Sequence, residues 1–503
     1  MIEGWRARLT PLLLCGLPLS GCMVGPDYTP PTVDPPDAWH AALVDGLDAD
    51  TAEPSAWWRA FDDPTLDELI LLAEERNLRL RTAAYRIDLA RAQFGFAAAD
   101  LMPGIVANGQ AQWQRRSDES NIASEILPDS EFVAAIDMSW EIDVWGRVRR
   151  SMESARAEIQ ESVEMWRDLL VTIRAEVAMS YVAVRTLQEE LRMLEASIAL
   201  RREALDVTQQ KYDAGVVTDL QIAKALAALS SVESQVPPVQ TDIAKAINRI
   251  SVLIGESPGP LRDRLDQPGP LPAPPARIAV GIPADVIRQR PDIRAAERRI
   301  AVESAQIGAN VANLYPQFTI GGSIGFESTS FNQWFNADNF VAGVGPSVVW
   351  PIFSGGKILS SIESADIETR EAVLKYEQSV LLALEEVENV LIGYVNAISS
   401  REHLRIAAEA YEEVVGLSTE RYEAGVEDLD RLIDAQRLML EAQEAYVKAD
   451  GQVTAQVVSL YKALGGDWQL SPGPTPEAEP VDLWHDATQG RFGLDLPLPE
   501  SEP

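Results

Sequence analysis

The chain carries one ten-residue pattern twice, and this repetition constrains the fold more than any other feature of the sequence. KYDAGVVTDL occupies residues 211–220 and RYEAGVEDLD occupies residues 421–430, with the cation, the tyrosine, the glycine and the acidic character kept. Other matches follow in the same order, such as residues 253–255 against residues 463–465. Matches that keep both their order and their spacing indicate the duplication of one ancestral unit.

Each half is predicted to contain one helix of unusual length. Residues 147–212 and 357–422 contain no proline, and their apolar residues recur with helical spacing. At 1.5 Å per residue each helix would be roughly 100 Å long, which few globular cores require.

Shorter helices are predicted before and after each long helix. They are expected over residues 65–100, 219–255, 283–313 and 428–465. The consecutive prolines Pro237 and Pro238 are expected to kink or break the second of these four helices. Each half is therefore expected to read as helix, two strands, long helix, turn and helix.

The strands are predicted from segments in which apolar and polar residues alternate. The alternation is clear over residues 105–114, 132–143 and 318–327, and weaker over residues 340–352. In the weaker segment Pro346 predicts an irregular structure or a position near a rim.

These segments have the length and the two-faced character of transmembrane β-strands. Each is close to the roughly 9–11 residues that a tilted strand needs to cross a bilayer. Trp113, Trp140 and Trp350 lie near strand ends, where tryptophan suits the membrane interface. Four strands cannot close a pore, so spanning strands would have to share one barrel among several copies. An ordinary sheet in water is the alternative interpretation.

The N-terminus is predicted to be a bacterial lipoprotein signal. A short basic region precedes an apolar run that is too short to span a bilayer, so residues 1–21 are expected to be removed. Leu19-Ser20-Gly21-Cys22 matches a lipobox, which makes Cys22 the predicted site of lipid attachment. Met23 stands where aspartate would favour the inner membrane, so the outer membrane is expected. A plain signal peptide with a coincidental cysteine is the alternative.

The remaining boundaries follow from proline content and from the repeats. The expected order is residues 22–64 as a lipidated tether, 65–255 as the first repeat, 256–282 as a proline-rich connector, 283–466 as the second repeat and 467–503 as an acidic, proline-rich tail.

Composition and spacing argue against nucleic-acid binding and against catalysis. With 43 basic and 77 acidic residues the net charge is -34, whereas phosphate backbones require basic patches. His40, His403 and His485 are scattered, and no Cys or Glu accompanies them at metal-ligand spacing. We therefore expect no enzyme, no cofactor and no metal site.

Several motifs together resemble the TolC-like outer-membrane efflux proteins, specifically the lipoprotein subfamily of RND efflux systems (NodT/OprM-like). The motifs lie in order over nearly the whole mature chain: residues 19–22 and 25–28, Asp143-Val144-Trp145-Gly146-Arg147, the repeated tyrosine–glycine turns, residues 290–294, residues 350–356 and residues 460–466.

This resemblance implies a mainly α fold with a membrane β-barrel. Three protomers would each contribute four strands to a 12-stranded barrel in the outer membrane. This barrel would continue into the periplasm as an α-helical barrel. A periplasmic adaptor (membrane fusion) protein and an inner-membrane RND transporter are the implied partners. The implied role is a passive exit duct for small toxic compounds, and family members are conduits rather than enzymes.

The resemblance also assigns the two repeated stretches to helix-turn tips that face the adaptor. Lys211 and Arg421 end helices, where the macrodipole favours a cation. The tip residues are two tyrosines, two glycines suited to positive φ, and two aspartates that cap or favour the next helix: Tyr212, Gly215, Asp219, Tyr422, Gly425 and Asp428.

A periplasmic aperture is implied just beyond the second tip. Asp430, Asp434 and Arg437 share one helix face at i, i+4 and i+7, whereas Leu429, Leu432, Ile433 and Gln436 would pack on the other side. The alternative is that the three charges belong to a solvated face held by i, i+3 and i, i+4 pairs.

The sequence is compatible with three functions. The first is the export channel of a tripartite pump, and the second is an exit channel for protein secretion in the same fold. The third is a lipid-anchored periplasmic spacer without a pore.

Overall fold

The computed structural model describes residues 23–41, 46–48, 56–113, 130–466 and 468, and these form parts of two compact units. The sheet unit contains the chain up to Thr29 together with residues 91–158 and 300–371. The helical unit contains residues 30–90, 159–299 and the chain from residue 372 onward. The predicted lipid site, Cys22, and most of the predicted tail lie outside the described residues.

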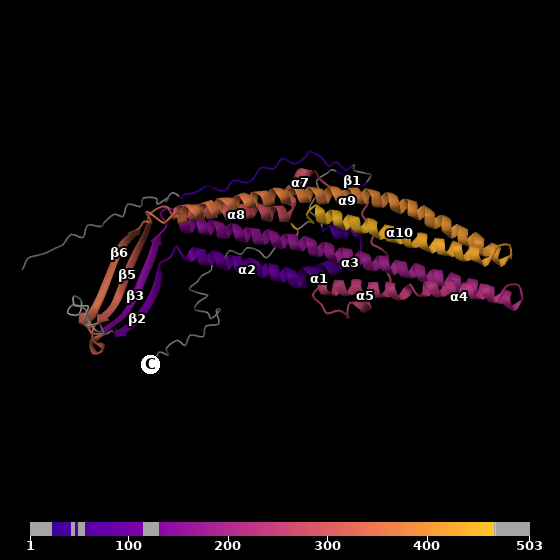
Figure 1. Ribbon diagram of the computed structural model, residues 1–503, viewed down its shortest axis with the longest axis horizontal. Helices are drawn as coiled ribbons and strands as arrows, with labels where there is room; N and C mark the ends of the chain where they lie inside the picture. The colour runs from indigo at the N-terminus through magenta and orange to yellow at the C-terminus, as the bar shows by residue number, and fades with distance from the viewer. Residues whose placement is uncertain (1–22, 42–45, 49–55, 114–129, 467, 469–503) are drawn as a thin grey trace, which may run out of the picture. The chain divides into compact units, whose positions relative to one another are not determined.

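The sheet unit is built on four antiparallel strands (Figure 1). They are β2 (Gly104–Trp113), β3 (Ser130–Ile142), β5 (Gln317–Ser328) and β6 (Phe340–Val349), in the order β2-β3-β5-β6. Within the described residues β2 and β6 each have one strand neighbour, so both ends of this sheet carry an edge strand.

The register sorts the side chains of this sheet onto two different faces. Ile136 lies opposite Ala107 on β2 and Ile324 on β5, and directly opposed residues point to the same face. Along β3 the positions that share this face are Phe132, Ala134, Ile136, Met138, Trp140 and Ile142, and the other face carries Glu131, Val133, Ala135, Asp137, Ser139 and Glu141. The predicted alternation is confirmed.

Pro346 does not interrupt the last strand, contrary to the prediction of an irregular segment. It stands within β6 and opposite Ile320 of β5. Proline lacks the N–H group that a central strand needs, and β6 is an edge strand, where that loss is tolerated.

Two tryptophans at equivalent positions make the same kind of hydrogen bond, one in each half of the sheet unit. The indole nitrogen of Trp140 donates to Leu101 O at 2.8 Å, and that of Trp350 donates to Leu314 O at 3.0 Å. These two contacts occupy matching positions in the duplicated sequence, which supports the assignment of the repeat.

The long helices have the predicted extent. Helix α3 spans Arg147–Asp213 and α9 spans Lys357–Glu423, and each has 67 residues. The second return helix, α10, is continuous over Leu429–Ala463. The first return helix is divided into α4 (Asp219–Glu233) and α5 (Val236–Leu253), with Pro237 and Pro238 in the first turn of α5, so the predicted break is confirmed.

The first helix of each half is two helices rather than the single predicted one. In the first half α1 (Pro64–Arg76) and α2 (Leu78–Ala99) meet at Asn77, and in the second half α7 (Pro283–Gln289) and α8 (Pro291–Ala312) meet at Arg290. Both junction residues have extended ψ angles, 123° and 124°. Pro291 disfavours a helical conformation at Arg290, whereas Asn77 uses its side chain to start the next helix.

Asn77 and Arg290 also make equivalent closing contacts. The side-chain amide of Asn77 donates to Leu253 O at 2.7 Å, and the guanidinium of Arg290 donates to Ala463 O at 2.7 Å. Leu253 and Ala463 are the last residues of α5 and α10. Each half of the helical unit is thus closed by one side chain that satisfies a helix-end carbonyl.

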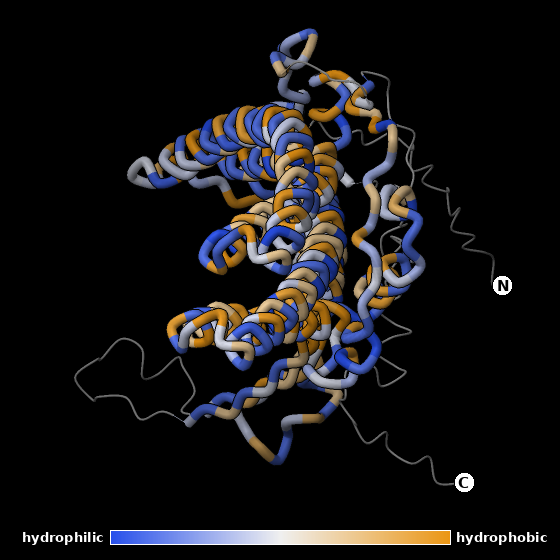
Figure 2. Tube along the Cα trace, turned by 90° about the vertical axis from the view of Figure 1, so that its right-hand side faces the viewer, coloured by the Kyte–Doolittle hydropathy of each residue, from blue (hydrophilic) through white to orange (hydrophobic). Residues whose placement is uncertain are grey.

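The helices of the helical unit bury one face and expose the other. In α10 Leu432, Met439 and Val457 are buried, whereas Asp434 and Arg437 are exposed. Figure 2 shows the same alternation of hydrophobic and hydrophilic residues around the helices. Amphipathic packing therefore supplies the core, as the helical periodicity predicted.

The segment predicted as an N-terminal tether is packed at two places. Residues 23–28 pack within the sheet unit, and the short 3-10 helix η1 (Trp57–Phe61) is buried in the helical unit. There Trp57 stacks on Tyr461 with ring centroids 5.2 Å apart. The predicted connector also carries short structure, α6 (Arg262–Leu265) and β4 (Ile278–Ala279), and β4 pairs in parallel with β1 (Leu47–Asp48).

Among the helices in the described ranges, none has both the length and the apolar content required to cross a bilayer.

Replacing Asn77 tests the closing contact. Asn77→Ala removes the bond to Leu253 O and the two capping bonds that Asn77 Oδ1 accepts from the Arg79 and Leu80 amides. We expect the free energy of unfolding to fall by about 1–3 kcal/mol, as for other buried groups left without a partner. Asn77→Asp keeps the caps but sets a carboxylate oxygen against Leu253 O in a buried site, so it should cost at least as much as Asn77→Ala. Chemical denaturation should show no change for the exposed control Arg81→Ala.

Candidate functional site

The two repeated stretches form matching helix-turn tips in the helical unit. At the first tip Val216 N–H donates to Lys211 O at 2.8 Å, and at the second Val426 N–H donates to Arg421 O at 2.9 Å. Gly215 and Gly425 both have φ of +74°, the left-handed conformation that ends a helix and favours glycine. The predicted role of the two glycines in ending the helices is confirmed.

The tip tyrosines, although equivalent in sequence, lie in different surroundings. Tyr212 is 38 % exposed, whereas Tyr422 is only 3 % exposed. The Tyr422 hydroxyl shares a hydrogen bond with Thr208 at 2.8 Å, and Lys211 Nζ lies 3.8 Å from the Tyr422 ring centroid. Lys211 also donates to Tyr422 O. The end of α3 therefore holds the end of α9 through one tyrosine.

The two tip aspartates lie at the starts of the next helices, as predicted, but in different positions. Thr218, not Asp219, is the N-cap of α4, and it forms a capping box with Gln221. Asp219 lies in the first turn, where its hydrogen bond with the hydroxyl of Tyr212 raises the pKa of that group. Asp428 does occupy the N-cap position of α10, but its side chain accepts no capping hydrogen bond.

The three aperture candidates lie on the exposed face of α10 and each has a partner in the same chain. Asp430 accepts from Lys224 of α4 at 2.8 Å. Asp434 and Glu441 each pair with Arg437 at 2.7 Å, with i, i+3 and i, i+4 spacing. The structure brings these residues to one face, and that face carries the charge pairs which the alternative interpretation also predicted.

The opposite face of α10 packs as predicted. Leu429 and Leu432 are buried together with Tyr422, and Ile433 packs against this cluster. Gln436 is buried as well. The spacing of these residues in the sequence was sufficient to predict the buried face, because burial on a helix follows the helical periodicity.

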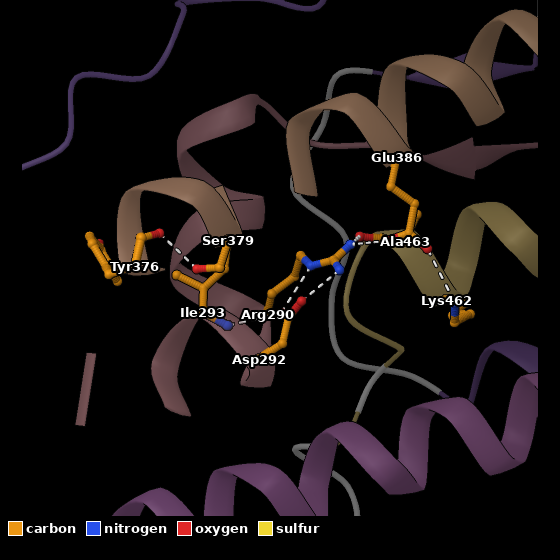
Figure 3. Close-up of polar contacts among 8 residues, drawn as sticks. All are labelled: Arg290, Asp292, Ile293, Tyr376, Ser379, Glu386, Lys462 and Ala463. Atoms are coloured by element: carbon orange, nitrogen blue, oxygen red, sulfur yellow. Dashed lines mark hydrogen bonds and ion pairs between the residues drawn. The ribbon is translucent and has the colours of Figure 1, made fainter. Parts of the chain in front are cut away.

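A cluster of charged side chains lies at the start of α8 and was not predicted from the sequence. Figure 3 shows Arg290 bonded to Asp292, to Glu386 of α9 and to Ala463 O, with Lys462 of α10 also bonded to Glu386. Burial alone would raise the pKa of Glu386, but Arg290 and Lys462 outweigh it and lower that pKa. Apart from Asp292, the partners are 76 to 173 residues apart in the chain, so local patterns carry no signal for them.

Asp168 of α3 lines a polar cavity of about 200 Å³ beside this cluster. Thr172, Arg290, Asp292 and Lys462 line the same cavity. Burial, together with the nearby charge of Asp292, raises the pKa of Asp168 from 3.8 to about 6. Its ionised form is thus disfavoured in the folded chain.

Neither the tips nor this cluster has the features of a metal site. Within the described ranges no group of three or more His, Cys, Asp or Glu side chains is placed to hold an ion. The arrangement consists of paired charges on helix faces and half-buried ion pairs that join helices.

Both repeats of this chain resemble a known protein family. The family described as outer membrane efflux protein matches the chain twice, over residues 69–256 and over residues 282–466. The chain belongs to the outer membrane efflux protein family. This membership confirms the resemblance, the outer-membrane location and the efflux role predicted from the sequence, and the two matched ranges correspond to the two repeats.

Relatives of this efflux protein resemble it over nearly their whole length. Nodulation protein T of Rhizobium leguminosarum bv. trifolii is 31 % identical, with 90 % of this chain and 95 % of the relative covered. The solvent efflux pump outer membrane protein SrpC of Pseudomonas putida is 28 % identical, with 90 % and 97 % covered. The outer-membrane channel OprN superposes with a TM-score of 0.81 at 31 % identity, covering 89 % of this chain and 100 % of that one.

The raised pKa of Asp168 predicts how stability depends on pH in this efflux protein. The folded chain binds a proton at Asp168 more tightly than the unfolded chain does, so ionisation lowers stability progressively as the pH rises from about 4 to about 6. Asp168→Asn should therefore raise the free energy of unfolding at pH 7.5 by up to about 3 kcal/mol, and the gain should vanish near pH 4.

Thermal unfolding across this pH range is the measurement. Asp292→Asn is the matched comparison: it should lower stability at pH 7.5, because Asp292 pairs with Arg290 at 2.8 Å. A constant difference between Asp168→Asn and the wild type at every pH would contradict the assignment.

Proposed function

We propose that this protein is the outer-membrane channel of a tripartite efflux pump, a passive exit duct for small toxic compounds such as drugs, solvents or metal ions. The observation that carries the proposal is the four-stranded sheet with one apolar face, one polar face and an edge strand at each end. A bilayer tolerates no open sheet edge, so such a sheet is completed only by further copies.

In this proposal three protomers supply 12 strands to one barrel. The apolar face, with Ile136 and Ile324 at its centre, meets lipid, and the polar face, with Asp137, lines the pore. The two 67-residue helices of each protomer supply the walls of a periplasmic duct. An N-terminal lipid on Cys22 is part of the same proposal.

The tips are proposed to meet a periplasmic adaptor that connects the channel to an inner-membrane RND transporter. Val216, Leu220 and Val426 are exposed apolar residues at the tips, beside the exposed Tyr212. Exposed apolar side chains at a helix-turn tip favour contact with a partner protein.

Conductance of the purified protein tests the channel. Heat-sensitive, SDS-resistant trimers and single-channel currents in planar bilayers are the expected results. A monomer that never conducts would favour a periplasmic spacer instead. An exit channel for protein secretion would conduct as well. Loss of secreted proteins, rather than increased drug or solvent sensitivity, in a strain without the gene would identify it.

The aperture assignment predicts the effect of removing two charges. Asp430→Ala combined with Asp434→Ala shortens two side chains and breaks the pairs with Lys224 and Arg437. We expect the conductance of the isolated channel to rise by roughly two-fold or more, since rings of charge at a constriction control ion passage.

Glu402, an exposed carboxylate paired with Arg405 on α9, provides the control, and Glu402→Ala should leave the conductance unchanged. An unchanged conductance of the double variant would remove the aperture from these residues and leave the proposed architecture intact.

A further inference from the structure

Arg150 of α3 is buried in the sheet unit and is bound mainly by the first described residues of the chain. Its side chain is only 2 % exposed. It donates to Val24 O at 3.2 Å, to Gly25 O at 3.4 Å and to the Asp27 carboxylate at 2.7 Å. The fourth acceptor, Glu153 at 2.7 Å, lies on the same helix. Three of the four acceptors of a buried cation therefore come from one short segment.

The surface that receives this segment, here called the Arg150 surface, includes Gly146, Arg150 and Gly308. A Cβ atom on Gly25 would lie 2.4 Å from the Cα atom of Gly308 on α8, so the two backbones touch. A Cβ atom on Gly146 would lie 2.7 Å from Cγ of Met23. Glycine at these places leaves room for a backbone to lie flat against the helices.

Both ends of residues 23–28 also contact other parts of the sheet unit. Val24 N–H donates to Trp145 O at 3.1 Å, and Trp145 follows β3 by three residues. Tyr28 packs against Ala157, Ala301 and Val302. Trp145 itself stacks on Tyr315 and donates to Pro316 O, directly before β5. The segment is thus joined to the ends of β3 and β5 that adjoin the helices.

We propose that the Arg150 surface is a docking site for residues 23–28, and that it makes the N-terminal anchor a rigid part of the sheet unit. Cys22, the predicted lipid site, directly precedes Met23 in the sequence. A lipid on Cys22 would then enter the membrane beside the strand ends, and Arg150 would be a positioning residue for insertion and assembly of the sheet. This inference rests on the proposed function.

Two insertions in the full-length lipoprotein test this geometry. A flexible Gly-Ser hexapeptide between Met23 and Val24 separates the lipid from the docked segment. The same hexapeptide between Thr29 and Pro30 leaves the lipid and the docked segment together. We expect the first insertion to reduce the yield of SDS-resistant oligomers by at least about five-fold and the second to leave it unchanged. Equal yields from the two would overturn the proposal.

Arg150→Met tests the cation, with the exposed Arg156→Met on the same helix as its matched control. Asp27→Asn is a milder variant that keeps the chain foldable. In Arg150→Met the Val24 amide should exchange hydrogen at least about tenfold faster, with mass spectrometry confirming the lipid on Cys22. Wild-type exchange in that variant would overturn the docking.

The two proposals fail in different ways. Absence of conductance from the wild-type protein would contradict the proposed channel, and hydrogen exchange would still decide whether residues 23–28 dock. A conducting wild type, with Arg150→Met assembling as well as Arg156→Met, would contradict the positioning role alone.

Discussion

Each half of the helical unit depends on satisfying the carbonyl that ends its return helix. Asn77 does this for Leu253 O in the first half, and Arg290 does it for Ala463 O in the second. The last carbonyls of a helix have no partner within the helix, and a buried end requires one from elsewhere. One donor at the junction of two short helices therefore fixes the return helix against the helices that begin the repeat.

Asn77 and Arg290 occupy equivalent positions in the repeat but differ in charge, and the residues around them differ accordingly. Asn77 is neutral, and its side chain bonds only to backbone groups: Leu253 O and the Arg79 and Leu80 amides. Arg290 is charged, and it is accompanied by Asp292, Glu386 and Lys462, with Asp168 close by. A largely desolvated guanidinium requires acceptors for its remaining N–H groups, which explains why several charged residues accompany this one arginine.

The same divergence within a repeat appears at the tips. Two stretches that share the tyrosine, the alanine, the glycine and the valine after it end their helices with the same backbone hydrogen bonds and the same glycine φ. Their tyrosines nevertheless separate into an exposed Tyr212 and a buried Tyr422. The pairing of Lys224 with Asp430 likewise joins the first return helix to the second. The two copies of the repeat thus keep the same local structure, but their equivalent residues make different contacts.

The sequence alone determined whatever repeats locally: two 67-residue helices, four alternating strands, the glycine turns and the break before Pro237. It did so because helical and strand periodicity follow from backbone geometry and from which side faces the core. Only the tertiary structure decided the junctions at Asn77 and Arg290, the burial of Tyr422 and the contact of Arg150 with residues 24–27. These depend on partners more than a hundred residues away, and the position of such partners is set by packing rather than by any local pattern.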